Sequence, residues 1–153
     1  MPPDFMETAE ENGSQRTVNM YEYRVDEVID IIDGDTIDVK IDLGFDISLK
    51  KRVRLTGIDT PESRTTDLHE KKYGLQAKEW LKHKLENAHH IVIRTELPDS
   101  TEKYGRILGT LFVGGEEISV NDQLIKGGYA WAYEGGTKRK DFAALDALRS
   151  APL

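Results

Sequence analysis

Three short segments of the sequence carry acidic and basic side chains of the kinds that metal-assisted phosphodiester chemistry uses. They are Asp33-Gly34-Asp35-Thr36, the stretch from Arg54 to Glu62, and Lys103-Tyr104-Gly105-Arg106. Aspartates can hold a hard divalent cation, a further carboxylate can activate water, and arginines can clamp a phosphate while negative charge develops on it. Each segment alone is common in turns and loops, so the prediction depends on their order and on the strands between them.

Alternating apolar and polar residues predict the strands that position these segments. The first strand leads into a tight reversal at Asp33-Gly34-Asp35, so we expect a hairpin there. Gly114-Gly115 indicates a further hairpin near the end of the fifth strand. The predicted strands cover residues 21–32, 37–42, 47–55, 91–93 and 107–113.

Arg54 and Asp59 need a bend between them if they are to act together. Val53 and Leu55 are expected to face the core, which turns Arg54 outward. Arg54 and Asp59 then lie on opposite faces of a straight strand. Gly57 is the residue that permits the strand to bend or end between them.

Helical periodicity appears in three places. Residues 62–72 are charged and polar, so we expect a mobile loop there, with an amphipathic helix of about four turns starting near Tyr73. Ser119 is expected to cap a short helix that stops at Gly127-Gly128. Residues 137–149 predict a last helix. The residues expected to face inward on the long and last helices are Ala77, Trp80, Leu81, Leu85, Ala88, Phe142, Leu145 and Leu148.

Composition narrows the class of protein. The 153 residues suit one domain at 21–153, preceded by a polar, acidic and disordered tail at 1–20. The chain has no cysteine and no apolar run near the roughly 20 residues that a membrane span needs. The first residues lack the features of a secretory signal, so we expect a cytoplasmic protein, with secretion left open for a processed form.

The net charge of −7 is unusual for a protein that holds nucleic acid, because phosphate contacts favour basic surfaces. A local basic cleft can coexist with that charge. An enzyme also gains less than a binding protein from tight ground-state binding. We therefore expect modest, salt-sensitive affinity.

The sequence resembles the staphylococcal nuclease (thermonuclease or micrococcal nuclease) family from about Tyr23 to Tyr133. The segments that carry the resemblance are Ile32 to Ile37, Arg54 to Glu62, Tyr73-Gly74, Glu102 to Arg106 and Asn121-Asp122. The resemblance implies an α+β fold with a five-stranded oligonucleotide-binding (OB) barrel and three helices. It also implies one bound calcium ion and hydrolysis of DNA or RNA to 3′-phosphate products.

The resemblance also implies a role for each matching residue. Asp35, Asp59 and the backbone carbonyl of Thr60 would bind calcium, and Glu62 would act as the general base or orient the attacking water. The residues expected to contact the substrate are Arg54, Arg106, Lys103, Tyr104 and Tyr133. Lys103 can equally be a solvated surface residue, and the two tyrosines can equally be packing residues. The four histidines have no zinc-binding spacing, and we assign them no chemistry.

Two other functions remain open on the sequence. A catalytically silent OB module could bind nucleic acid or protein, although such modules usually lose the charged set that is present here. A calcium-responsive interaction protein ranks last, because the chain has no EF-hand pattern. We expect a monomer; the sequence does not discriminate DNA from RNA or single from double strands.

Overall fold

The computed structural model describes residues 21–95, 106–133, 136 and 139–150. Two of the predicted substrate contacts, Lys103 and Tyr104, lie outside these residues, as does the predicted acidic tail. Among the described residues, no helix is long and apolar enough to cross a membrane.

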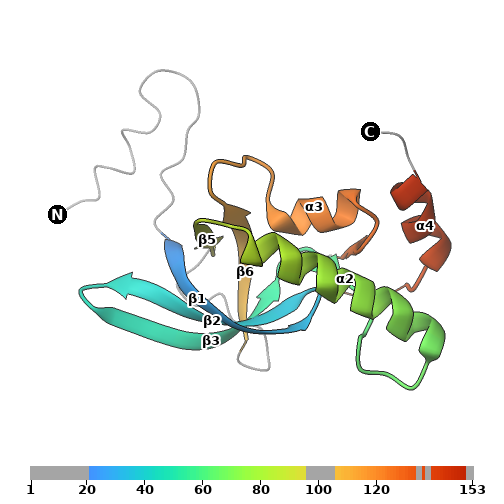
Figure 1. Cartoon of the computed structure of the whole chain (residues 1–153), viewed down its shortest axis with the longest axis horizontal. Helices are drawn as coiled ribbons and strands as arrows, with labels where there is room; N and C mark the ends of the chain where they lie inside the picture. Colours follow the sequence, from blue (N-terminus) through green and yellow to red (C-terminus); the bar gives the residue numbers. More distant parts are fainter. Residues whose placement is uncertain (1–20, 96–105, 134–135, 137–138, 151–153) are drawn as a thin grey trace.

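The five predicted strands form a closed barrel in the order β1-β2-β3-β6-β5 (Figure 1). They are β1 (Glu22–Asp33), β2 (Thr36–Gly44), β3 (Ile47–Leu55), β5 (Ile91–Arg94) and β6 (Ile107–Val113). The β3–β6 pair is parallel, and the other pairs are antiparallel. Register shifts along β1 mark bulges, which bend a strand and help a sheet to close. The predicted α+β class with an OB-type barrel is confirmed.

Apolar residues at alternate positions of the strands fill the barrel. Ile37, Val39 and Val53 have no exposed surface, and Leu81 of the long helix packs against the same cluster. Full burial of such a side chain contributes about 1.5–3 kcal/mol. The alternation that predicted the strands thus also supplies the core on which the site is built.

Three helices accompany the barrel in the described chain: α2 (Leu68–Glu86), α3 (Val120–Lys126) and α4 (Phe142–Ser150). Helix α2 packs along β1 (Figure 1). Ser119 caps α3 by accepting a hydrogen bond from the backbone N–H of Asp122, and α3 ends at Gly127, as predicted.

The prediction of a mobile loop over residues 62–72 was wrong in its second half. Helix α2 begins at Leu68, because the carboxylate of Asp67 caps it by accepting hydrogen bonds from the backbone N–H groups of His69 and Glu70. The inward-facing residue of the first turn is Glu70, which is only 4% exposed. A charged residue facing inward removes the apolar periodicity by which a helix is recognised in a sequence.

Two smaller predictions also need correction. Helix α4 begins at Phe142 rather than at residue 137, and Leu148 is 40% exposed, while Leu145 is buried as expected. Gly114-Gly115 makes a turn, but the chain then enters α3 instead of a partner strand. A glycine pair marks the turn without specifying the element that follows it.

Candidate active site

The bend after β3 brings Arg54 and Asp59 together. Gly57 adopts a φ of +80°, which a residue with a side chain rarely adopts, and the chain continues into the short strand β4 (Ile58–Asp59). Strand β4 pairs with β7 (Trp131–Ala132), a two-stranded sheet that the sequence did not predict. The Arg54 guanidinium then lies 3.4 Å from the Asp59 carboxylate, so the bend predicted at Gly57 is confirmed.

Arg54 is the centre of this cluster. It is only 9% exposed, and its Nη1 atom lies 3.3 Å from Oδ2 of Asp35. The same nitrogen donates a hydrogen bond of 3.0 Å to the backbone carbonyl of Ile58. One planar guanidinium therefore contacts carboxylates from two segments, the β1–β2 turn and β4.

Asp35 is held from two further sides. The hydroxyl of Thr36 donates to Oδ1 at 2.8 Å, and the backbone N–H of Thr60 donates to Oδ2 at 3.0 Å. Asp35, Asp59 and Thr60 are all buried. Hydrogen bonds of this kind stabilise the charged carboxylate, so the orientation of Asp35 is set before any ligand arrives.

The donor atoms of this cluster fit a hard cation such as calcium. Asp35 and Asp59 offer carboxylate oxygens, and the buried hydroxyl oxygen of Thr60 has no hydrogen-bond partner among the described residues. Within those residues, no group of three or more His, Cys, Asp or Glu side chains could hold a metal. Two carboxylates with a third protein oxygen leave most of the six to eight positions of calcium to water and substrate.

The backbone that carries Glu62 is anchored to its surroundings. The N–H of Glu62 donates to Oε2 of Glu70 at 3.0 Å, and the N–H of Ser63 donates to Oδ1 of Asp33 at 3.1 Å. The Ser63 hydroxyl also hydrogen-bonds the same Asp33 oxygen. The side chain of Glu62 itself is exposed, so an anchored backbone presents a carboxylate that solvent can reach.

Gly74 explains how the chain at Glu62 can lie against α2. A Cβ atom at position 74 would fall 2.3 Å from the carbonyl oxygen of Glu62 and 2.6 Å from the nitrogen of Ser63. No real Cβ atom approaches backbone that closely. The absence of a side chain at position 74 is therefore what allows this contact.

Lys140 places a positive charge next to Glu70. Its Nζ donates to Oε1 of Glu70 at 2.9 Å. That hydrogen bond is the largest cause that raises the pKa of Lys140 above its ordinary value, and the charges of Glu62 and Asp59 raise the pKa further. Lys140 thus remains charged beside the buried carboxylate of Glu70.

Arg106 lies in a hollow that adjoins the Arg54 cluster. It is half-buried just before β6 and lines this hollow together with Thr36 and Asp33. Tyr133 lies beside the bend, where its N–H donates to the carbonyl of Gly57 at 2.8 Å and its hydroxyl donates to the carbonyl of Gly136 at 3.1 Å. The structure therefore brings Asp35, Arg54, Asp59 and Thr60 together, with Arg106 in the next hollow.

Sequence reasoning gave no role to several residues that build the site. Asn121 is one of them: its amide donates to the carbonyl of Thr56 at 2.8 Å, and its oxygen accepts the N–H of Leu111 at 3.1 Å. It joins α3 to the bend and to β6. Asn121 occurs in one of the segments that resemble the family, and this resemblance could have identified it. No local sequence pattern pointed to Glu70 or Lys140.

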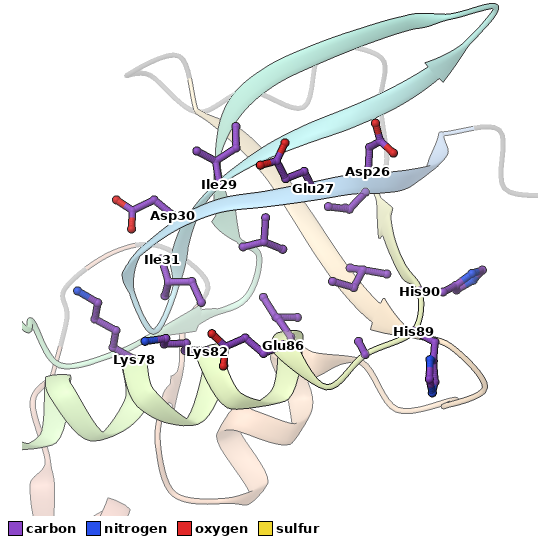
Figure 2. Close-up of a pocket in the computed structure, with 15 residues that line it drawn as sticks. Asp26, Glu27, Ile29, Asp30, Ile31, Lys78, Lys82, Glu86, His89 and His90 are labelled. Carbon is purple, nitrogen blue, oxygen red and sulfur yellow. The ribbon is translucent and has the colours of Figure 1, made fainter.

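A second hollow, of about 560 Å³, lies between β1 and α2 and contains none of the predicted site residues. Figure 2 shows Ile31 directed from β1 toward α2, with Lys78 and Lys82 on the helix side. The carboxylates along this hollow are those of Asp26, Glu27, Asp30 and Glu86. Because four carboxylates outnumber the two lysines, the charge of this hollow does not favour binding of a polyanion such as nucleic acid.

Comparison with known proteins identifies relatives of this chain. Residues 52–151 match the family described as staphylococcal nuclease homologue. An uncharacterized protein of Methanocaldococcus jannaschii, MJ1439, is 28% identical over 85% of this chain and 69% of its own length. Protein ParB of Escherichia coli is 38% identical over 70% of this chain and 56% of its own length.

Endonuclease YncB of Bacillus subtilis is 35% identical over 75% of this chain. The match covers 52% of YncB, so this chain spans about half the length of YncB and of ParB. The matched segment, the barrel and the cluster around Arg54 all point to the same family. The chain belongs to the family of staphylococcal nuclease homologues.

Proposed function

We propose that this protein is a calcium-dependent nuclease that hydrolyses phosphodiester bonds of DNA or RNA and leaves 3′-phosphate products. The observation that carries the proposal is the position of Arg54 between the buried carboxylates of Asp35 and Asp59. The name of one relative, endonuclease YncB, supports the same activity. The 3′-phosphate products follow from the family resemblance.

Asp35, Asp59 and Thr60 would hold the calcium ion. The family resemblance implies the backbone carbonyl of Thr60 as the ligand, and the hydroxyl oxygen of the same residue, unpartnered within the described chain, is a further donor. When bound, calcium polarises a phosphoryl oxygen as a Lewis acid. The protein's own contribution is the orientation of the donors, which the hydrogen bonds from Thr36 and Thr60 to Asp35 provide.

Glu62 would act on the attacking water. In this step the water oxygen bonds to phosphorus, its proton passes to the Glu62 carboxylate, and the bond from phosphorus to the 5′ oxygen breaks. The 5′ oxygen leaves with a proton from solvent. The anchored backbone of Glu62 supports this role, because a general base must lie within hydrogen-bond reach of the proton that it takes.

Arg54 and Arg106 would stabilise the charge that develops on the phosphate, since a guanidinium donates two parallel hydrogen bonds to phosphate oxygens. Arg54 is already among the carboxylates, and Arg106 would reach the phosphate from the adjoining hollow. Lys103, Tyr104 and Tyr133 remain predicted contacts to the flanking nucleotides, through phosphate pairing and base stacking.

Hydrolysis of denatured DNA and of RNA, with calcium or with a chelator, tests the activity. We expect cleavage only with calcium, and a loss of about 10²–10⁴-fold in rate for Glu62→Gln, the usual contribution of a general base. Glu117→Gln is the matched control, because Glu117 is an exposed glutamate before α3. End-group analysis should find phosphate on the 3′ ends.

A folded wild-type protein that cleaves neither polymer with calcium would contradict the proposal. Binding of nucleic acid without cleavage, independent of metal, would instead support the silent OB module. Far-ultraviolet circular dichroism of each preparation verifies that the loss in Glu62→Gln is not a loss of fold.

A further inference from the structure

A basic hollow of about 710 Å³ lies along the edge of β3 next to the candidate active site. Strands β3 and β6 pair only from Val53 with Ile107 to Leu55 with Gly109. On that side of β3, the earlier residues therefore have no strand partner in the described chain. The side chains along this hollow include Lys50, Lys51, Arg52, Arg106, Thr36 and Asp33.

The charges of this hollow are positive and partly uncompensated. Lys50 and Lys51 form no ion pair with any described residue. Arg52 makes two hydrogen bonds to Asp38, of 2.8 and 3.0 Å, and the carboxylate of Asp33 accepts hydrogen bonds from Ser63. The two lysines therefore remain available to an anion from outside, and this hollow has one lining carboxylate, that of Asp33, where the hollow between β1 and α2 has four (Figure 2).

The hollow is continuous with the Arg54 cluster. Thr36, which lines it, donates its hydroxyl to Asp35 and lies opposite Arg54 in the β2–β3 register. Lys50, Arg52 and Arg54 occupy alternate positions of β3, so they share one face and follow one another at intervals of about 6.6 Å. Lys51 has the opposite parity and is not part of this row, but it also lines the hollow. A row of cations thus leads away from the predicted position of the scissile phosphate.

We propose that this hollow is a second phosphate-binding subsite, which holds the backbone of a single polynucleotide strand beyond the scissile phosphate. The inference rests on the proposed function, because Arg54 marks the phosphate from which the strand continues. One row of cations on one strand edge matches one sugar-phosphate backbone rather than the two of a duplex. Phosphate contacts position a strand without reading its bases, so the subsite adds affinity and not sequence preference.

Equilibrium binding in chelator tests the subsite without requiring catalysis. The probes are fluorescent oligothymidylates and oligouridylates of about 4 and about 16 nucleotides, the range of OB-fold site sizes. Each single-strand phosphate contact contributes about 0.7 to the slope of log K against log salt. For Lys50→Ala/Lys51→Ala we expect the slope with the longer probe to become shallower by up to about 1.4, with a smaller change for the shorter probe.

Lys126→Ala is the matched control, because Lys126 is an exposed lysine at the end of α3 and outside the hollow. Lys50→Ala alone, with thermal unfolding of every variant, separates lost contacts from lost fold. A shallower slope with either polymer supports the subsite and identifies the backbone that it accepts. A slope unchanged with both polymers, or changed equally by Lys126→Ala, overturns it.

The two proposals fail separately. If the wild-type protein binds the longer probe through Lys50 and Lys51 but never cleaves it, the nuclease proposal fails and the subsite remains. If it cleaves but the slope does not change, only the subsite fails.

Discussion

Arg54 organises the candidate site, although the protein as a whole carries a net charge of −7. Its charge is balanced locally by Asp35 and Asp59, at 3.3 and 3.4 Å. Removing one partner of a buried ion pair typically costs 3–5 kcal/mol, because the other charge is left uncompensated. The cluster is therefore a structural unit as well as a candidate catalytic one.

Glu70 is a second residue on which the site depends, although it is not expected to touch substrate. Its two carboxylate oxygens accept hydrogen bonds from different partners, the backbone N–H of Glu62 and the ammonium of Lys140. A glutamine has only one acceptor oxygen, so its amide nitrogen would face one of these two donors. Where the nitrogen faces the N–H of Glu62, the backbone there has to move, and where it faces Lys140, the ammonium group has to move.

We therefore expect Glu70→Gln to lower kcat by about 10²-fold, the effect of a misplacement of about 1 Å, while KM changes little. Steady-state kinetics on a single-stranded oligonucleotide measures both parameters. Glu79→Gln is the control, since Glu79 is exposed on the same helix. A normal kcat in folded Glu70→Gln would show that Glu70 does not position Glu62.

At the scale of elements, the contact between α2 and the segment at Glu62 depends on Gly74. Glycine inside a helix normally costs about 1 kcal/mol relative to alanine, so Gly74→Ala should stabilise an isolated helix. Here the added Cβ would meet backbone atoms of Glu62 and Ser63, which cannot rotate away as a side chain can. Overpacking of this kind typically costs 1–3 kcal/mol and exceeds the gain in propensity.

We expect Gly74→Ala to reduce the free energy of unfolding by about 1–2 kcal/mol and to lower kcat, because the shift reaches the Glu62 backbone. Urea unfolding and turnover on one preparation test both effects. Leu75→Ala provides the comparison, since Leu75 is the next residue on α2 and is 47% exposed. A Gly74→Ala protein that is as stable and as active as the wild type would contradict the contact.

At the scale of the whole molecule, α4 is joined to α2 and to the end of α3. The hydroxyl of Tyr73 hydrogen-bonds the carboxylate of Asp146 at 3.0 Å, and Arg149 donates to the carbonyl of Gly128 at 2.9 Å. Figure 1 shows α4 beyond the barrel, on the side of α2 and α3. These side chains hold α4 in place, because only Leu145 of its residues is fully buried.

The Tyr73–Asp146 bond predicts a pH dependence of stability. The bond raises the pKa of Tyr73 above its ordinary value, because it favours the protonated phenol. Its contribution is therefore complete below the unfolded-state pKa of about 10 and is lost as the pH rises through the raised pKa of the folded state.

We expect Tyr73→Phe to lower the midpoint of thermal unfolding at neutral pH, and the difference from the wild type to shrink above about pH 10. Thermal unfolding of both proteins across this range is the measurement. Tyr21→Phe controls for the alkaline titration of other tyrosines, because Tyr21 lies outside the α2–α4 contact. A difference that does not depend on pH would exclude this bond as its source.

The residues by themselves determined the strands, the reversal at Asp33-Gly34-Asp35 and the bend at Gly57, and the family resemblance implied the OB-type barrel. The strands and the bend follow from local rules: side chains alternate along a strand, and a left-handed turn favours glycine. The proximity of Arg54 and Asp59 follows from the bend, since they are only five positions apart in the sequence. The roles of Glu62 and Arg106 remain predictions.

Only the tertiary structure decided how the backbone at Glu62 is held. Glu70 and Lys140 are 70 residues apart, and Asn121 and Thr56 are 65 residues apart, so no local pattern joins them. The start of α2 was missed for a related reason, since its inward residue is the charged Glu70 and its partner lies near α4. A buried charge is stable only when its partners are in place, and the fold alone brings those partners together.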